Sequence, residues 1–220
     1  MEQLKKLFLI FLFLDYAITA DKSYKILSTE IQTMIYPNRT INFIETREFS
    51  FKGKFSYVYQ VIPKRGYDKI FDIQVFENGK PYLNTNTKEE GTFLVDERER
   101  SYRIYLYHNS LNETKKFTVK YSLENPFTVG VDDSQFYWIY LSDRWDKSPG
   151  DLLISQKFYS DIKNDDIIQI VEQPANPNKY KLKIEGSSLT FSSLDFSSNN
   201  EMKLRTCLLY TSPSPRDKCR

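Results

Sequence analysis

Apolar and polar residues alternate along most of this chain, and this period of two limits what it can fold into. In the segment 116–121, Phe, Val and Tyr alternate with Lys, Thr and Lys, and similar alternation recurs at 71–75 and 102–107. Because successive side chains of a strand point to opposite faces, the pattern predicts strands with one buried and one solvated face. No segment has apolar residues at helical spacing over several turns, and one short helix is predicted, around Asp161 to Ile168.

Further strands are predicted where apolar residues lie between turn signals. The apolar residues between Ile41 and Phe51 mark one or two strands, and Phe55 to Ile62 mark another. Val129 to Leu141 is apolar on both faces, which is typical of a strand covered on both sides. Asn78-Gly79 suits a tight hairpin turn. Many short strands with regular turns predict an all-β fold, an antiparallel β-sandwich of immunoglobulin-like architecture.

The first twenty residues have the features of a secretory signal peptide. Lys5 and Lys6 precede the short apolar run Leu7 to Leu14, and small and polar residues follow up to Ala20. The run is too short to cross a bilayer of about 30 Å. We therefore expect residues 1–20 to be removed on export, and residues 21–206 to form one extracytoplasmic domain.

The last fourteen residues differ from the rest of the chain. Residues 207–220 are rich in Ser and Pro, show no strand alternation, and resemble translated sequencing-adapter read-through. We interpret them as a non-native tail, which sets aside Cys207 and Cys219. On this interpretation the chain is a truncated fragment and the natural protein continues past Thr206.

The charge balance argues against a nucleic-acid partner. The chain has 31 Lys and Arg against 29 Asp and Glu, and without leader and tail 26 of each remain. A protein that neutralises phosphates needs a basic face, and no run of Lys or Arg suggests one. The 16 Tyr and 16 Phe can instead supply a large hydrophobic core.

No residue pattern indicates catalysis, a metal site or a cofactor. His108 is the single histidine, and its place beside Asn109-Ser110 predicts an exposed residue flanking a turn. A catalytic base would need an orienting partner, and none can be identified in the sequence. We expect a protein that is not an enzyme, with no catalytic residues, no metal ligands and no cofactor.

An aromatic cluster is the best candidate for a binding site. Tyr137, Trp138 and Tyr140 lie close together in the sequence, with Trp145 nearby. Exposed Tyr and Trp rings stack on sugars and anchor peptides, so these four residues are the candidate ligand-binding set. The alternative is that one parity of this segment fills the core and the other is covered by a loop.

The order of several short motifs resembles that of a known family. The matching pieces are listed here in chain order: Ile44-Glu45, Phe49 to Phe55, Val61-Ile62-Pro63, Ile73-Gln74-Val75, Tyr102-Arg103-Ile104, Lys116 to Tyr121, Tyr137-Trp138 and Trp145. Together they are similar to the extracytoplasmic N-terminal domain of DUF2207, a family of uncharacterised bacterial membrane proteins. The similarity spans most of Ser23 to Thr206.

The resemblance implies a domain outside the cytoplasm that a downstream transmembrane helix anchors to the membrane. It implies no catalytic residues. The family often has a basic residue just before the Ile-Pro step, where this chain has Gln60. We expect an interaction or assembly module of the bacterial envelope with a protein or glycan partner. The alternative is a carbohydrate-binding module that uses exposed aromatic residues.

Overall fold

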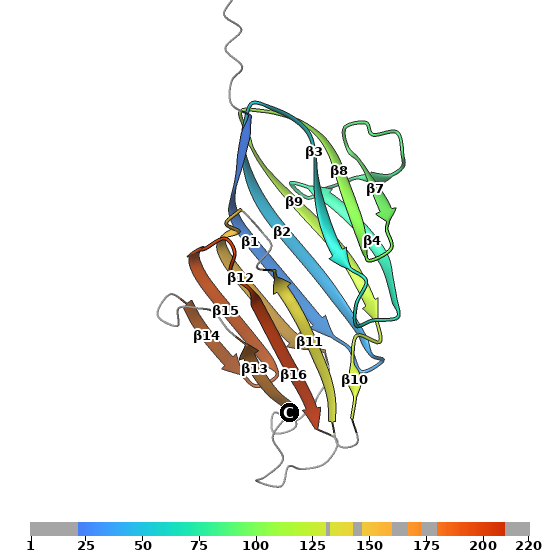
Figure 1. Ribbon diagram of the computed structural model, residues 1–220, viewed down its shortest axis with the longest axis vertical. Helices are drawn as coiled ribbons and strands as arrows, with labels where there is room; N and C mark the ends of the chain where they lie inside the picture. The colour runs from blue at the N-terminus through green and yellow to red at the C-terminus, as the bar shows by residue number, and fades with distance from the viewer. Residues whose placement is uncertain (1–21, 131–132, 143–146, 160–166, 173–179, 210–220) are drawn as a thin grey trace, which may run out of the picture.

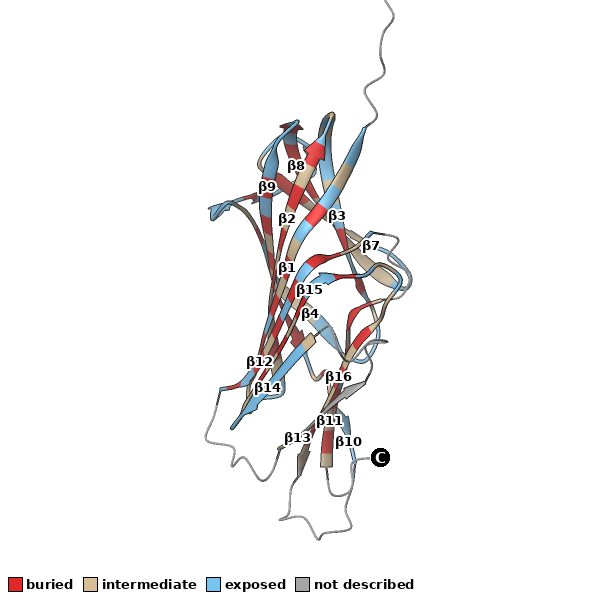
Figure 2. Ribbon diagram, turned by 90° about the vertical axis from the view of Figure 1, so that its left-hand side faces the viewer, coloured by how far each residue is buried: buried red, intermediate tan, exposed pale blue. Residues whose placement is uncertain are grey.

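The protein is an all-β sandwich of one large and two small sheets. The computed structural model describes residues 22–130, 133–142, 147–159, 167–172 and 180–209, and all regular secondary structure in them is strand. Both small sheets lie over the same face of the large one, at its two ends (Figures 1 and 2). The predicted all-β sandwich is confirmed, and its immunoglobulin-like architecture stays a prediction. The predicted signal peptide lies outside the described residues.

The strands are arranged as follows. The eight-stranded sheet has the order β14 (Tyr180–Glu185), β15 (Ser188–Phe196), β12 (Gly150–Phe158), β1 (Ser23–Ile35), β2 (Thr40–Lys52), β9 (Thr114–Glu124), β4 (Lys69–Glu77) and β5 (Lys80–Pro81). One small sheet has the order β3 (Lys54–Pro63), β8 (Ser101–Leu111), β7 (Thr92–Glu97) and β6 (Leu83–Asn84). The other has the order β10 (Thr128–Val129), β11 (Asp133–Leu141), β16 (Met202–Leu209) and β13 (Ile167–Glu172).

Strand β2 shows how the sequence forms this architecture. The predicted one or two strands around Ile41 to Phe51 are one continuous strand, in which buried and half-buried residues alternate without interruption. Its buried face packs against both small sheets. The Phe43 ring lies 5.1 Å from that of Trp138 in β11, and the Phe51 ring lies 5.1 Å from that of His108 in β8. The large sheet and both small sheets therefore share one hydrophobic core.

Two strand pairs differ from the antiparallel expectation. β1 pairs with β12 in parallel, and so does β6 with β7, whereas the other pairs are antiparallel. The β1–β12 pair joins the first described strand to a strand from the C-terminal half of the chain. Two parallel neighbours need a long connection between them, and the chain from β2 to β11 provides it here.

Three local predictions need correction. β11 is not covered on both faces, because Phe136 and Trp138 are buried whereas Tyr137 between them is exposed. Ile167 and Ile168, at the end of the predicted helix, lie in β13, and residues 161–166 are outside the described residues. β16 continues to Leu209, with Cys207 buried, so strand structure extends beyond Thr206.

Candidate functional site

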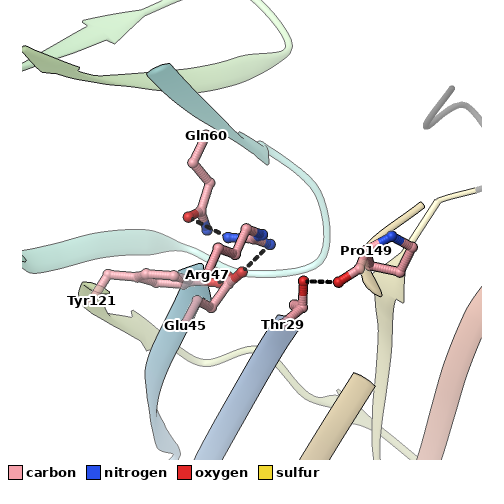
Figure 3. Close-up of polar contacts among 6 residues, drawn as sticks. All are labelled: Thr29, Glu45, Arg47, Gln60, Tyr121 and Pro149. Atoms are coloured by element: carbon pink, nitrogen blue, oxygen red, sulfur yellow. Dashed lines mark hydrogen bonds and ion pairs between the residues drawn. The ribbon is translucent and has the colours of Figure 1, made fainter. Parts of the chain in front are cut away.

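A buried ion pair lies on the inner face of β2. The alternation from Ile41 to Phe51 places Glu45 and Arg47 at inward positions, where each side chain is at most 10% exposed. Arg47 Nη2 donates to Glu45 Oε2 at 2.7 Å, and Arg47 Nη1 donates to Gln60 Oε1 of β3 at 2.8 Å (Figure 3). Such charges remain inside a protein only when they are paired and hydrogen-bonded.

Tyr121 completes this polar cluster from the neighbouring strand β9. Its hydroxyl donates to Glu45 Oε1 at 2.6 Å. Burial raises the pKa of Tyr121 well above its usual value, and the Glu45 carboxylate raises it further. The phenol therefore stays protonated and remains a donor. We name Glu45, Arg47, Gln60 and Tyr121 the polar cluster.

The polar cluster borders a pocket between β3 and the large sheet. The pocket has a volume of about 450 Å³, within the usual range for ligand sites. Its walls include Tyr24 of β1, Phe49 of β2 and Val58 of β3, and Glu45, Arg47 and Gln60 supply polar groups. Lys22 and Lys147 also line it and are exposed. The site therefore combines apolar walls, a polar cluster and two exposed lysines.

The sequence did not single out the polar cluster as a site, although one signal was available. Glu45 and Arg47 share the parity of Phe43 and Phe49, so the alternation places two charged residues on a buried face. Two opposite charges at i and i+2 of an inward face indicate a buried pair. Gln60 accepts a hydrogen bond from Arg47, so its position faces a guanidinium.

The predicted aromatic set does not come together on the surface. Trp138 and Tyr140 are buried, whereas Tyr137 is 39% exposed and lies 5.4 Å from the Arg205 guanidinium. Trp145 lies outside the described residues. The described rings of this set are therefore divided between the core and the surface: one parity fills the core, as the alternative interpretation expects, whereas Tyr137 of the other parity is exposed and not covered.

Tyr140 has a structural role between the sheets. Its hydroxyl lies 3.0 Å from Thr33 Oγ1 and donates to Gln156 Oε1 at 3.1 Å. Gln156 Nε2 in turn donates to Thr206 Oγ1 at 2.5 Å. This chain of hydrogen bonds joins β1, β11, β12 and β16, so Tyr140 links the large sheet to a small one.

A different group of tyrosines lies on the outer face of the β3–β8 pair. Tyr57 and Tyr59 are about half exposed, and their rings lie 5.7 Å from that of Tyr105. The Arg103 guanidinium lies 4.6 Å from the Tyr59 ring centre, within cation–π range. The sequence shows the alternation at 102–107, but only the fold shows that this segment, in β8, pairs with β3.

His108 is buried, so its prediction as an exposed, turn-flanking residue is wrong. It lies within β8, two residues further from the turn than Ser110, and its Nδ1 is 2.6 Å from Ser110 Oγ. Its ring packs 5.0 Å from that of Phe117. Burial lowers the pKa of His108 to about 4, and nearby Lys115 lowers it further, whereas Glu77 opposes this.

This pKa predicts a pH-dependent stability. The pKa of an unfolded histidine is near its usual value of 6.5, so between pH 6.5 and about 4 the unfolded chain binds more protons than the folded one. The free energy of unfolding should therefore fall by about 3 kcal/mol from His108 as the pH drops through this window. Urea unfolding at several pH values measures the slope, and His108→Phe should reduce it. Equal slopes for both proteins would contradict the prediction.

The described residues hold no group of three or more His, Cys, Asp or Glu that could bind a metal ion. They also contain no helix long and apolar enough to span a membrane. Fold and site together define a β-sandwich domain with a polar-lined pocket between its sheets.

The chain belongs to the DUF2207 family. Residues 25–207 match the family described as "Predicted membrane protein (DUF2207) N-terminal domain", which confirms the resemblance and covers both sheets that form the pocket. No curated protein is similar to the chain in sequence.

Solved structures with similar folds are distant. A candidate nutrient binding protein from Legionella pneumophila is 11% identical with a TM-score of 0.47, and the match covers 83% of this chain and 66% of that one. An M1 zinc metallopeptidase from Deinococcus radiodurans is 7% identical with a TM-score of 0.47, over 84% and 43% of the two chains. The chain thus spans less than half of that metallopeptidase. At TM-scores below 0.5, neither similarity carries information about function.

Proposed function

We propose that this is a non-catalytic binding domain of a membrane protein and that its ligand site is the pocket beside β3. The observation that carries the proposal is the pocket itself, which has apolar walls next to a hydrogen-bonded polar cluster. Pockets with mostly apolar walls and a few fixed polar groups are typical of ligand sites. Family membership supports attachment to a membrane. The leader-like segment 1–20 supports a location outside the cytoplasm.

The residues of the pocket favour binding over catalysis. Among the described residues that line it, Glu45 is the one carboxylate, and both of its oxygens accept hydrogen bonds, from Arg47 and Tyr121. Glycoside hydrolysis needs two carboxyl groups about 5 to 10 Å apart across the scissile bond. A carboxylate bonded on both oxygens is suited to holding the site in shape.

Carbohydrate binding is the second candidate, and one observation favours it. Tyr57, Tyr59 and Tyr105 form an exposed group of rings on the outer face of the strand that borders the pocket. Rings of this kind can stack on sugars. Glycan probes therefore belong in the same experiment as peptide probes.

A bulky residue in the pocket tests the proposal. Val58→Trp should fill the pocket from its β3 wall, whereas Leu83→Trp adds the same side chain at a position that is 73% exposed and outside the pocket lining. Fluorescent peptides of defined charge and cell-wall glycan oligosaccharides are titrated into the full chain. We expect at least one probe to bind saturably to the wild type and to Leu83→Trp, with an affinity about tenfold or more lower for Val58→Trp.

The same titrations show how the proposal would fail. Chromatography of the probe after incubation should recover it unchanged. Conversion of a probe by the wild type but not by Val58→Trp would show catalysis. Equal binding of every probe to all three proteins would show that the pocket is not the site.

A further inference from the structure

Strand β3 has one unpaired edge. It is the outermost strand of its sheet and pairs only with β8 among the described strands. No backbone hydrogen bond between described residues reaches its other edge. An unpaired edge presents a row of N–H and C=O groups to which another strand can add.

The register shows which residues of β3 face the open edge. The Lys64 N–H donates to the Arg100 carbonyl, one pair beyond Pro63 and Ser101. Hydrogen-bonded and non-hydrogen-bonded pairs alternate in an antiparallel ladder. Val58, Gln60 and Ile62 therefore bond to β8, whereas Tyr57, Tyr59 and Val61 direct their N–H and C=O groups outward.

Two further observations agree with this assignment. The Tyr107 carbonyl accepts from the Gly91 N–H, so Tyr107, the partner of Tyr57, directs its backbone away from β3. Pro63 occupies the next outward position of β3, where its missing N–H removes no ladder bond.

The pocket follows this open edge. Seven consecutive residues of β3, Phe55 to Val61, line it, and Tyr24 and Ile26 of β1 lie on another wall. Seven strand residues extend over about 23 Å. The features that normally protect an edge lie at the two ends of β3: Lys54, the irregularity between Phe55 and Tyr57, and Pro63. The central part from Tyr57 to Val61 has none of them.

The charges around the pocket indicate what would bind. Lys22 and Lys147 line it and are exposed, and the charge of Arg47 is offset by its ion pair with Glu45. The one carboxylate among the described lining residues, Glu45, is already bonded to Arg47 and Tyr121. Positive charge around a site favours an anionic partner.

We propose that an extended acidic peptide segment of a partner protein binds in this pocket by adding a strand to the open edge of β3. Backbone hydrogen bonds to Tyr57, Tyr59 and Val61 give affinity, and Lys22 and Lys147 select acidic side chains. This inference rests on the proposed function, because it names the ligand class of the same pocket.

A proline substitution separates the contribution of the β3 backbone to peptide binding from that of the side chain. Tyr59→Pro removes one outward N–H, whereas Tyr59→Ala removes the same ring and keeps that N–H. The probe is a fluorescein-labelled decapeptide of alternating Val and Glu, titrated into the full chain by anisotropy at low salt. We expect Tyr59→Pro to bind it at least about tenfold more weakly than Tyr59→Ala, since proline removes a hydrogen bond and blocks close approach. Equal affinities would overturn the proposal.

Hydrogen exchange keeps the test decisive if Tyr59→Pro does not fold. In the free wild type, the amides of Tyr57, Tyr59 and Val61 should exchange faster than those of Val58, Gln60 and Ile62. The Val-Glu peptide should then protect the first three. Binding without this protection would overturn strand addition.

Charge selection is measured with a matched peptide and a matched variant. A decapeptide of alternating Val and Lys should bind at least about tenfold more weakly than the acidic one. Lys22→Glu combined with Lys147→Glu should weaken acidic-peptide binding, whereas Lys80→Glu, on β5 and outside the pocket lining, should not. Equal binding of both peptides, or pocket-dependent binding of a glycan alone, would overturn this inference and leave the proposed function standing. Loss of all pocket-dependent binding would overturn both.

Discussion

Replacing Arg47 with methionine is expected to lower the free energy of unfolding by about 3 to 5 kcal/mol, the usual cost of breaking a buried ion pair. Arg47 provides hydrogen bonds to Glu45 and Gln60 at 2.7 and 2.8 Å. Without it, the Glu45 carboxylate, which is 7% exposed in the folded protein, would keep the hydrogen bond from the Tyr121 hydroxyl but lose its ion pair. Urea unfolding followed by tryptophan fluorescence measures the change.

Two controls identify the buried charge as the cause. The double variant Arg47→Met with Glu45→Gln should be more stable than Arg47→Met alone, because it removes the unpaired charge. Arg98→Met breaks the Arg98–Asp96 pair, whose side chains are 46% and 36% exposed, and should cost less than about 1 kcal/mol. A double variant as unstable as the single one would show that the loss comes from packing.

Replacing Gly150 with alanine is expected to destabilise the protein by on the order of 4 kcal/mol or more, a loss typical of severe steric conflicts. A Cβ at this position would lie 2.1 Å from the Leu27 carbonyl oxygen and 2.7 Å from that of Ile26. Both are backbone atoms of β1, next to the irregularity between Ile26 and Ser28, so no side-chain rotation relieves the clash. Gly150 also has a φ of 69°. The start of β12 would have to move away from β1.

Gly79→Ala is the matched control for this effect. Gly79 has a φ of 84°, but a Cβ there would meet no atom within 4 Å. Its replacement should therefore cost only about 1 to 2 kcal/mol, from the backbone conformation alone. Urea unfolding of the two variants measures the difference. If the free energy of unfolding falls with urea at the same slope in both, the difference in midpoints gives the difference in stability. Equal losses at the two glycines would show that the contact with β1 does not constrain Gly150.

Much of the fold could be predicted because its signal is local. A period of two shows directly which residues of a strand share a face, and it identifies Phe43 and Phe49 of β2 and Phe117 and Val119 of β9 as buried without any knowledge of neighbours. The same reasoning failed where a polar residue held an inward position. His108 is predicted at the surface because it lies beside Asn109-Ser110 at a turn, whereas its parity with Ile104 and Leu106 places it inside.

The candidate site depends on contacts that join distant parts of the chain. Ser148-Pro149-Gly150 has the composition of a turn, but nothing in these residues indicates that Gly150 lies against the backbone of β1. Trp138 and Tyr140 looked like a binding surface until the packing of β11 on β2 buried them.

From the sequence alone one can derive the strands, the all-β sandwich and the family, because alternation and motif order are written in consecutive residues. The polar cluster and the open edge of β3 required the folded chain. Glu45 and Tyr121 are 76 residues apart, and Arg47 and Gln60 are 13 apart on different sheets. Strand pairing over such separations is decided by which faces bury together in three dimensions, and among the described strands that same packing leaves the second edge of β3 unpaired along the pocket.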